Sequence, residues 1–178
     1  MSPDRSVTIL PLAAADPQKV DALLDAAFGA DRHGRTAYKL RNGCDAIPPY
    51  SLAAFDEAGD LVGSLQTWPI ELAGEDGRAT PLLLVGPVAV RPDRQRLGIG
   101  RAMMARALAA IDAARASPSM LIGDAEYYGR FFGYDAAPTQ QWGVPGPVER
   151  HRLLVRNPAG VRLPVEGTLR PRRAAIAA

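Results

Sequence analysis

The stretch "RQRLGIGRAMMARAL" (Arg94–Leu108) starts as a polar turn, passes through Gly98 and Gly100, and continues as an alanine-rich segment with the composition of a helix. The preceding segment, "PLLLVGPVAV" (81–90), is apolar nearly throughout, which is typical of a strand covered on both faces. A helix that starts at such a turn leaves backbone N–H groups unpaired, and the positive end of its dipole lies there too. A phosphate or diphosphate is the ligand that this turn favours.

The residues around the glycines exclude two common phosphate motifs. A Walker loop needs Gly-Lys followed by Ser or Thr, whereas Arg101 and Ala102 follow Gly100. A dinucleotide fingerprint needs a third glycine where Met103 stands. What remains is the pattern Gln-x-x-Gly-x-Gly over 95–100, placed after a strand that ends in Val-Ala-Val and "RPD".

Length and composition indicate one folded domain over residues 1–178, with an Arg/Ala-rich, frayed tail over 165–178. Hydrophobic residues make up 47% and charged residues 22%, which excludes a disordered chain. The net charge is only +2, so whole-surface nucleic-acid binding is not expected. Five arginines nevertheless gather in sixteen residues and predict a local anion site: Arg91, Arg94, Arg96, Arg101 and Arg106.

Cysteine and histidine usage predicts no metal site and a cytoplasmic location. Cys44 is the single cysteine, which excludes an internal disulfide, and His33 and His151 lie too far apart for ligand spacing. No apolar run approaches the roughly 20 residues of a membrane span, and the N-terminus lacks the pattern of a signal peptide. Neither a membrane nor secretion is therefore expected.

Hydrophobic periodicity and turn residues predict an alternating α/β chain. Expected strands are 7–12, 51–56, 61–72, 80–90 and 120–123, and expected helices are 17–28, 36–42, about 98–115 and 125–132. Asp16 is expected to cap the first helix. The segments "EAGD" and "AGEDGRA", which separate the second, third and fourth strands, combine Gly with Asp or Glu as hairpin turns do, and they predict antiparallel pairing of these strands. Because proline cannot donate to a ladder, Gly86-Pro87 predicts a bulge or a parting of the sheet. A right-handed helical crossover would set strands 80–90 and 120–123 parallel.

Two segments together resemble the GNAT superfamily of acyl-CoA-dependent N-acyltransferases: "VGPVAVRPDRQRLGIG" and "IGDAEYYGRFFGY". The second is similar to a segment found in a bacterial branch of predicted acetyltransferases. The resemblance covers roughly residues 7–155. It implies a single α/β (α+β) domain, in which a mixed, mostly antiparallel sheet parts between its fourth and fifth strands and carries helices on both faces.

The resemblance also implies acetyl-CoA as cosubstrate, without a metal. Main-chain groups of Val88, Ala89 and Val90 would bind the pantetheine arm like an added strand. The sequence itself places Arg94, Arg96 and Arg101 around the expected phosphate site, where they would supply positive charge. The N–H groups expected to hold the diphosphate belong to Gln95, Arg96, Leu97, Gly98, Ile99, Gly100 and Arg101.

Tyr128 is the expected catalytic residue, because the family places a tyrosine on this helix that faces the coenzyme sulfur and protonates the leaving thiolate. Tyr127 is the second candidate for that position. The base that accepts the amine proton is not visible in the sequence: relatives use a glutamate on the central strands or an ordered water, and none of the nearby carboxylates, Asp124, Glu126 and Glu71, stands out. Asp124 is expected first of all to cap its helix.

The expected reaction is direct attack of a primary amine on the acetyl thioester, with a strand N–H near Val88 stabilising the oxyanion. The acceptor, a small molecule or a peptide amine, stays open, as does a homodimer. Trp68 and Trp142 are expected to fill the sheet surface rather than line an acceptor pocket. Two alternatives remain: a non-catalytic acyl-CoA-binding module, and a basic nucleic-acid-binding domain.

Overall fold

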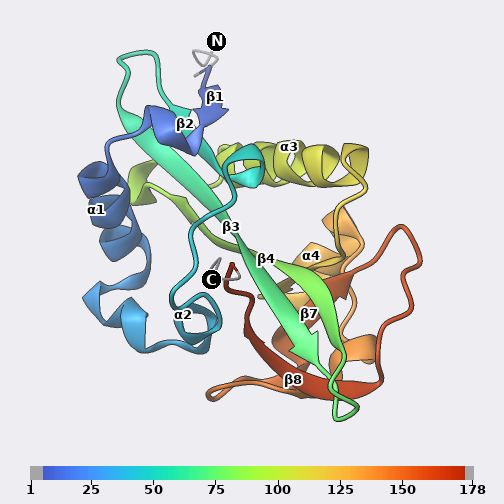
Figure 1. Ribbon diagram of the computed structural model, residues 1–178. Coiled ribbons are helices and arrows are strands. Elements are labelled where there is room, and N and C mark those ends of the chain that lie inside the picture. Colours follow the sequence, from blue (N-terminus) through green and yellow to red (C-terminus); the bar gives the residue numbers. More distant parts are fainter. Residues whose placement is uncertain (1–5, 175–178) are drawn as a thin grey trace.

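The computed structural model describes residues 6–174 and contains a single sheet flanked by four α-helices (Figure 1). The helices are α1 (Pro17–Phe28), α2 (Thr36–Leu40), α3 (Ile99–Ala113) and α4 (Ala125–Phe132). The strands are β1 (Thr8–Pro11), β2 (Leu52–Phe55), β3 (Leu61–Ala73), β4 (Ala79–Val90), β5 (Ser119–Ile122), β6 (Gln141–Gly143), β7 (Leu153–Arg156) and β8 (Glu166–Pro171). The expected helices and strands are all present, with ends that differ by one or two residues.

Helix α1 shows why the N-terminal elements could be predicted. The Asp16 carboxylate accepts a hydrogen bond from the Gln18 N–H at 2.9 Å, and Pro17 occupies the first helical position, where no N–H is needed. The helix ends at Gly29, whose φ of 89° suits a residue without a side chain. The predicted cap at Asp16 is confirmed.

The sheet runs in the order β1-β2-β3-β4-β5-β7, and β8 pairs with both β3 and β6. Neighbours from β1 to β4 are antiparallel, as the hairpin separators predict. Strand β5 is parallel to β4, so the predicted crossover through α3 is confirmed. The mixed, mostly antiparallel sheet is therefore the expected one.

The sheet parts at the position that Gly86-Pro87 predicts. Strand β5 pairs with β4 only at Leu83 and Leu84. On the other side of β4, Val85 lies opposite Thr67 and Val88 opposite Leu65, so Gly86 and Pro87 together face one residue of β3. The bulge is confirmed, and beyond it β4 keeps β3 as its only strand neighbour within the described residues.

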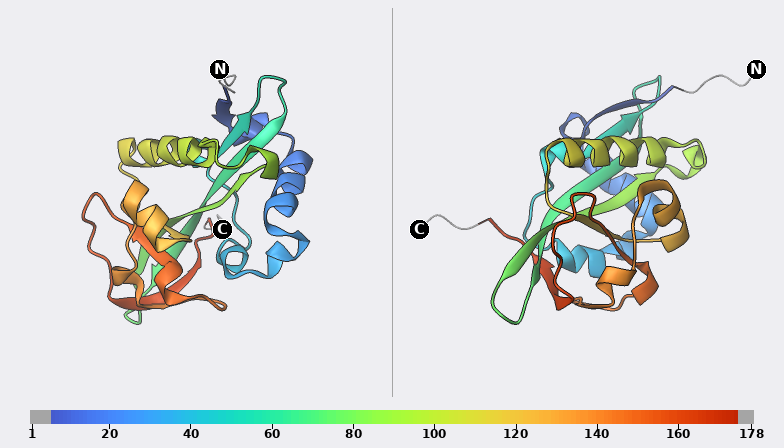
Figure 2. Two further views of the ribbon diagram at one scale, coloured as in Figure 1. Left: turned by 180° about the vertical axis from the view of Figure 1, so that it is seen from behind. Right: turned by 90° about the vertical axis from the view of Figure 1, so that its right-hand side faces the viewer.

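Helices cover both faces of the sheet (Figures 1 and 2). On one face, Val20, Leu23 and Leu24 of α1 pack against Ala53 and Ala89. On the other face, α3 packs against β2, β3 and β4, and α4 joins the same apolar cluster through partly buried aromatic side chains. Apolar burial on both faces explains why the central strands read as nearly continuous hydrophobic runs.

The prediction of a frayed tail over 165–178 is wrong for residues 166–171. These residues form β8, which pairs with β3 from Ile70 to Ala73, and Leu169 is buried in the core. The ladder hydrogen bonds and the burial of Leu169 outweigh the weak local preference of a sequence that contains Gly167 and Pro171. Residues 175–178 lie outside the described part of the chain.

Candidate functional site

Beyond the bulge, β4 presents an open edge at Val88–Val90. These three residues lie opposite Leu65, Ser64 and Gly63 of β3. The Arg91 N–H bonds to the Val62 carbonyl, and bonding across an antiparallel pair alternates. Val88 and Val90 therefore turn their N–H and C=O groups away from β3, toward the side where β5 has departed.

The same alternation turns the backbone groups of Ala89 toward Ser64. The structure thus disagrees with the expectation that all three residues offer main-chain groups to a ligand, because the Ala89 groups are directed into the β3 ladder. Its side chain is buried against α1. Val88 and Val90 remain as the residues with outward backbone groups.

The turn before α3, residues 95–101, holds a run of unpaired donors and is called the glycine turn below. Gly98 caps α3 with a φ of 78°, and Arg96 also has a positive φ, 67°. The first N–H of this region with a well-formed bond to another described residue is that of Ala102, to the Gly98 carbonyl at 2.9 Å. Seven consecutive N–H groups thus find no such acceptor in the described chain, the arrangement that holds phosphate oxygens.

Gly100 joins the glycine turn to the open edge of β4. A Cβ atom at Gly100 would lie 3.5 Å from Val90 Cγ2 and 3.8 Å from Val88 Cγ1. The Gln95 side-chain amide also approaches the Val90 carbonyl, at 3.5 Å. The fold therefore brings the two predicted coenzyme segments, 88–90 and 95–101, into one continuous surface.

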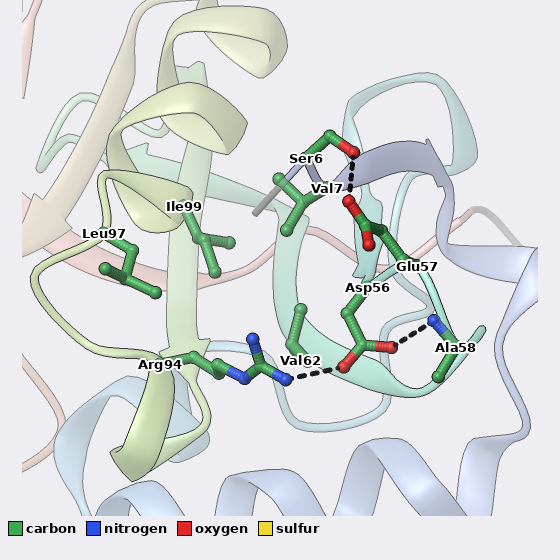
Figure 3. Close-up of a pocket in the computed structure, with 9 residues that line it drawn as sticks. All are labelled: Ser6, Val7, Asp56, Glu57, Ala58, Val62, Arg94, Leu97 and Ile99. Carbon is green, nitrogen blue, oxygen red and sulfur yellow. Dashed lines mark hydrogen bonds and ion pairs between the residues drawn. The ribbon is translucent and has the colours of Figure 1, made fainter. Parts of the chain in front are cut away.

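Arg94, which was expected to supply charge beside the ligand, is paired with a carboxylate in the structure. Its guanidinium donates to Asp56 at 3.0 Å across a hollow of about 320 Å³, which Leu97 and Ile99 also line (Figure 3). Asp56 follows β2, 38 residues before Arg94, and its carboxylate offsets the charge of this arginine next to the glycine turn. Arg96 and Arg101 remain exposed, and the Arg101 guanidinium lies 4.7 Å from the centre of the Phe131 ring.

Helix α4 positions Tyr128 beside the end of β5. The Asp124 carboxylate accepts from the Tyr127 N–H at 2.8 Å, which confirms Asp124 as the helix cap. The Tyr128 ring covers Gly123, where a Cβ would lie only 2.6 Å from Tyr128 Cε2. Because β5 has left β4 by this point, Tyr128 stands on the β5 side of the parting.

The environment of Tyr128 keeps its hydroxyl protonated. Burial raises the pKa of the phenol, and the nearby Tyr127 and Asp124 raise it further. Within residues 6–174 its hydroxyl has no hydrogen-bond partner. Tyr127 is 38% exposed and meets the Tyr128 ring edge-on at 5.0 Å. Of the two tyrosines, Tyr128 is the one held between α4 and the sheet.

Comparison with known proteins identifies the family. The model of the family described as "Acetyltransferase (GNAT) domain" matches residues 8–137. The chain belongs to this family. The uncharacterized N-acetyltransferase YhbS of Escherichia coli K12 is 28% identical over 145 residues, which cover 78% of this chain and 82% of YhbS.

Two solved structures share the fold of this GNAT protein. YhbS from E. coli in complex with CoA has a TM-score of 0.71 at 20% identity, covering 97% of this chain and 93% of its own. A GNAT acetyltransferase from Brucella melitensis in complex with acetyl-CoA has a TM-score of 0.66 at 23% identity, covering 94% and 97%. The family and the parted-sheet fold expected from the sequence are confirmed.

Two of the three candidate bases of this GNAT protein are already engaged. Glu71 accepts a hydrogen bond from Arg170 of β8 at 2.6 Å. This contact was not expected, because residues 165–178 were predicted to be a frayed tail. Asp124 is occupied as the cap of α4. Glu126 lies in the first turn of α4 and is exposed.

Sequence reasoning missed a second hollow, on the α2 side of the sheet. It has a volume of about 450 Å³ and is called the Arg41 hollow. Its lining residues are His33, Tyr38, Lys39, Arg41, Asn42, Gly43, Cys44 and Trp68. Trp68 was expected to fill the sheet surface, with a place in the lining of a pocket as the alternative, and it does line this hollow. Tyr38 and Arg41, three apart at the end of α2, were the available signal.

Residues 6–174 show neither a metal-binding cluster nor a membrane-spanning helix. No group of three or more His, Cys, Asp or Glu side chains is arranged to hold a metal ion. No helix in this part of the chain combines the length and apolar character needed to cross a membrane.

Proposed function

We propose that this GNAT protein transfers the acetyl group of acetyl-CoA to the primary amine of an acceptor by direct attack. The observation that carries the proposal is the run of unpaired N–H groups in the glycine turn, placed directly against the open edge of β4. A diphosphate joined to an arm that contains amides matches both parts of this surface.

The residues fit such a coenzyme without a further ligand. The glycine turn would hold the diphosphate, with Arg96 and Arg101 supplying charge, and the outward groups of Val88 and Val90 would pair with the amides of the arm. Two proteins of the same fold were solved with CoA or acetyl-CoA, which supports this choice of coenzyme.

The proposed transfer step uses groups on both sides of the gap between β4 and β5. The bound coenzyme supplies an activated acetyl thioester. An outward N–H near Val88 would donate to the carbonyl oxygen as the amine attacks, and the Tyr128 hydroxyl would donate its proton to the departing sulfur. The products are an amide and a free thiol; the amine proton leaves to solvent, and the Tyr128 phenolate takes a proton back from solvent. The raised pKa of Tyr128 supports this assignment, because the phenol then stays a donor at neutral pH.

Binding of the coenzyme is tested by thermal unfolding of the purified protein with CoA, acetyl-CoA and, as a control, DNA and RNA fragments. Coenzyme at about one hundred times its Kd stabilises a protein by about 2.7 kcal/mol. In a domain of this size that raises Tm by roughly 5–10 °C. Stabilisation by nucleic acid with a steep salt dependence, and none by CoA, would reject the proposal in favour of a basic nucleic-acid-binding domain.

Turnover is tested by thiol release from acetyl-CoA with a panel of amines. For an accepted amine, Tyr128→Phe should lower kcat about a hundredfold or more, because a positioned proton donor is lost while the ring is kept. CoA affinity should change little. Tyr127→Phe is the matched control and should retain kcat. Unchanged turnover in Tyr128→Phe would remove this hydroxyl from the mechanism, and CoA binding without transfer to any amine would favour a non-catalytic module.

A further inference from the structure

The Arg41 hollow contains a cation without a carboxylate partner. The Arg41 guanidinium carbon lies 3.7 Å from the centre of the Tyr38 ring and 4.3 Å from that of Trp68, so aromatic rings stack on the guanidinium. Arg41 Nη1 donates to the Gln66 side-chain oxygen at 3.0 Å. Within the described chain, no carboxylate lies within ion-pair distance of Arg41.

The buried Arg32, nine residues earlier, is by contrast an arginine whose charge is paired with carboxylates. Arg32 pairs with Asp25 at 2.8 Å and with Asp21 at 3.1 Å. Arg41 has an amide in place of these two acids. Burial lowers the pKa of its guanidinium more than the neighbouring Tyr38 and Asp21 raise it, so this charge is held partly out of water and is incompletely balanced.

The surroundings add positive charge to the hollow. Lys39 lines it beside Arg41, and none of its lining residues is an Asp or Glu. Arg173 borders it as well, since a Cβ at Gly43 would lie 3.0 Å from Arg173 Nε. The hollow is therefore complementary to an anion.

The hollow also adjoins the parting of the sheet. Trp68 Nε1 donates to the Gly86 carbonyl at 2.9 Å, at the point where the open edge of β4 begins. Gln66, which holds Arg41, is the residue of β3 that faces Gly86 and Pro87 across the bulge. A molecule bound at Arg41 would thus lie next to the place assigned to the acetyl thioester.

We propose that the Arg41 hollow is the acceptor site and that the acceptor is an amine that also carries a carboxylate. The rings of Tyr38 and Trp68 contact the guanidinium, and Gln66 takes an N–H at Nη1, so further N–H donors remain for a ligand; a carboxylate is the group that accepts two of them at once. The positive surroundings also oppose protonation of the amine, which must be neutral to attack. This inference rests on the proposed function, because it names the acceptor class of that same reaction.

The test compares acceptors that differ only in the carboxylate. The wild-type protein is assayed with acetyl-CoA and the α-amino acids, β-alanine and 4-aminobutyrate, each beside its carboxamide, with thiol release as the readout. At least one acid should exceed its carboxamide in kcat/KM by about tenfold or more, mainly through KM, because a charge-assisted bond is lost in the amide. Equal use of acids and carboxamides would overturn the proposal.

Variants assign this preference to Arg41. Arg41→Gln should bring the ratio of acid to carboxamide close to one, and Arg41→Lys should restore part of it, because the charge returns without the planar fork. Arg162→Gln, which removes an exposed charge outside the lining of the hollow, is the matched control and should keep the ratio. A ratio that survives in Arg41→Gln would overturn the role of Arg41.

A binding measurement separates this proposal from the proposed function. With CoA present, a bound amino acid should change the fluorescence of Trp68, which lines the hollow, whereas Trp142 is fully buried in the core. The change should disappear in Arg41→Gln. Saturable binding without acetyl transfer would contradict the enzyme and leave the anion site standing. Acetyl transfer to plain amines, with no fluorescence change from any amino acid, would support the enzyme and contradict the anion site at Arg41.

Discussion

Gly123 provides a way to move the Tyr128 ring without altering its chemistry. In Gly123→Ala the new Cβ would lie 2.6 Å and 2.9 Å from two carbons of that ring and 3.0 Å from Leu121 Cδ1. The ring cannot retreat freely, because the Phe132 and Tyr134 rings lie against it. Overpacking of this kind costs about 1–3 kcal/mol, which corresponds to a fall in Tm of roughly 2–12 °C for a chain of this length.

The effect on turnover depends on the hydroxyl. A shift of about 1 Å in a catalytic group costs about a hundredfold in rate, so Gly123→Ala should lower kcat by that order if Tyr128 protonates the sulfur. Steady-state thiol release and urea denaturation measure the two effects on the same samples. Gly34→Ala is the control, because its Cβ would meet no atom within 4 Å, and it should retain both activity and stability.

A double-mutant cycle with Tyr128→Phe shows whether Gly123→Ala lowers kcat by displacing the Tyr128 hydroxyl or by disturbing packing. The phenyl ring keeps the carbons that clash, so the stability loss from Gly123→Ala should persist in the Tyr128→Phe background. The loss in kcat should shrink to about twofold or less, because the proton donor is already absent. If Gly123→Ala lowers kcat by the same factor in both backgrounds, the ring acts through packing alone and the reasoning about its hydroxyl fails.

Three further substitutions test other parts of the structure. Gly98→Ala places a side chain at a φ of 78°, so it should lower the unfolding free energy by about 1–2 kcal/mol and weaken CoA binding. Gly77→Ala, at a φ of 77° in a hairpin, is the control and should lower the unfolding free energy by a similar amount without affecting CoA binding. Asp56→Asn should lower the unfolding free energy in urea by about 1–3 kcal/mol, because the partly buried Arg94 loses the nearer of its two carboxylates, at 3.0 Å. Asp93→Asn removes the farther and more exposed carboxylate, at 3.6 Å, and should cost less; equal costs would contradict the pairing. The Arg156 guanidinium holds the pKa of Asp112 below its ordinary value, so Asp112→Asn should be less stable than the wild type at pH 7, and this difference should fade as the pH falls below about 3.9. A difference that persists at pH 2 would contradict that linkage.

The features that were predicted correctly are those that neighbouring residues determine. Gly98 needs a left-handed φ to start α3, Pro87 cannot donate to a ladder, and Asp16 and Asp124 cap helices through N–H groups two or three residues away. Each effect acts within a few residues, so the sequence pattern contains its cause.

The features that were missed depend on partners far apart in the chain. Arg94 was expected beside the ligand, but Asp56 binds it from 38 residues away. The tail prediction failed because β8 is stabilised by pairing with β3, about 100 residues earlier, and not by its own propensity. Arg41 could be recognised as unpaired only once the fold showed that Gln66, and no acid, meets its guanidinium.

The bulge at Gly86-Pro87 connects the two halves of the proposed site. On one side of the sheet it ends the regular course of β4 and leaves the edge at Val88 and Val90 without a strand. On the other side, its carbonyl at Gly86 holds Trp68, and Gln66 opposite it holds Arg41. A regular strand here would extend pairing with β5 and would leave no carbonyl free for the Trp68 indole. The proposed coenzyme edge and the proposed acceptor hollow therefore both adjoin one irregularity of β4.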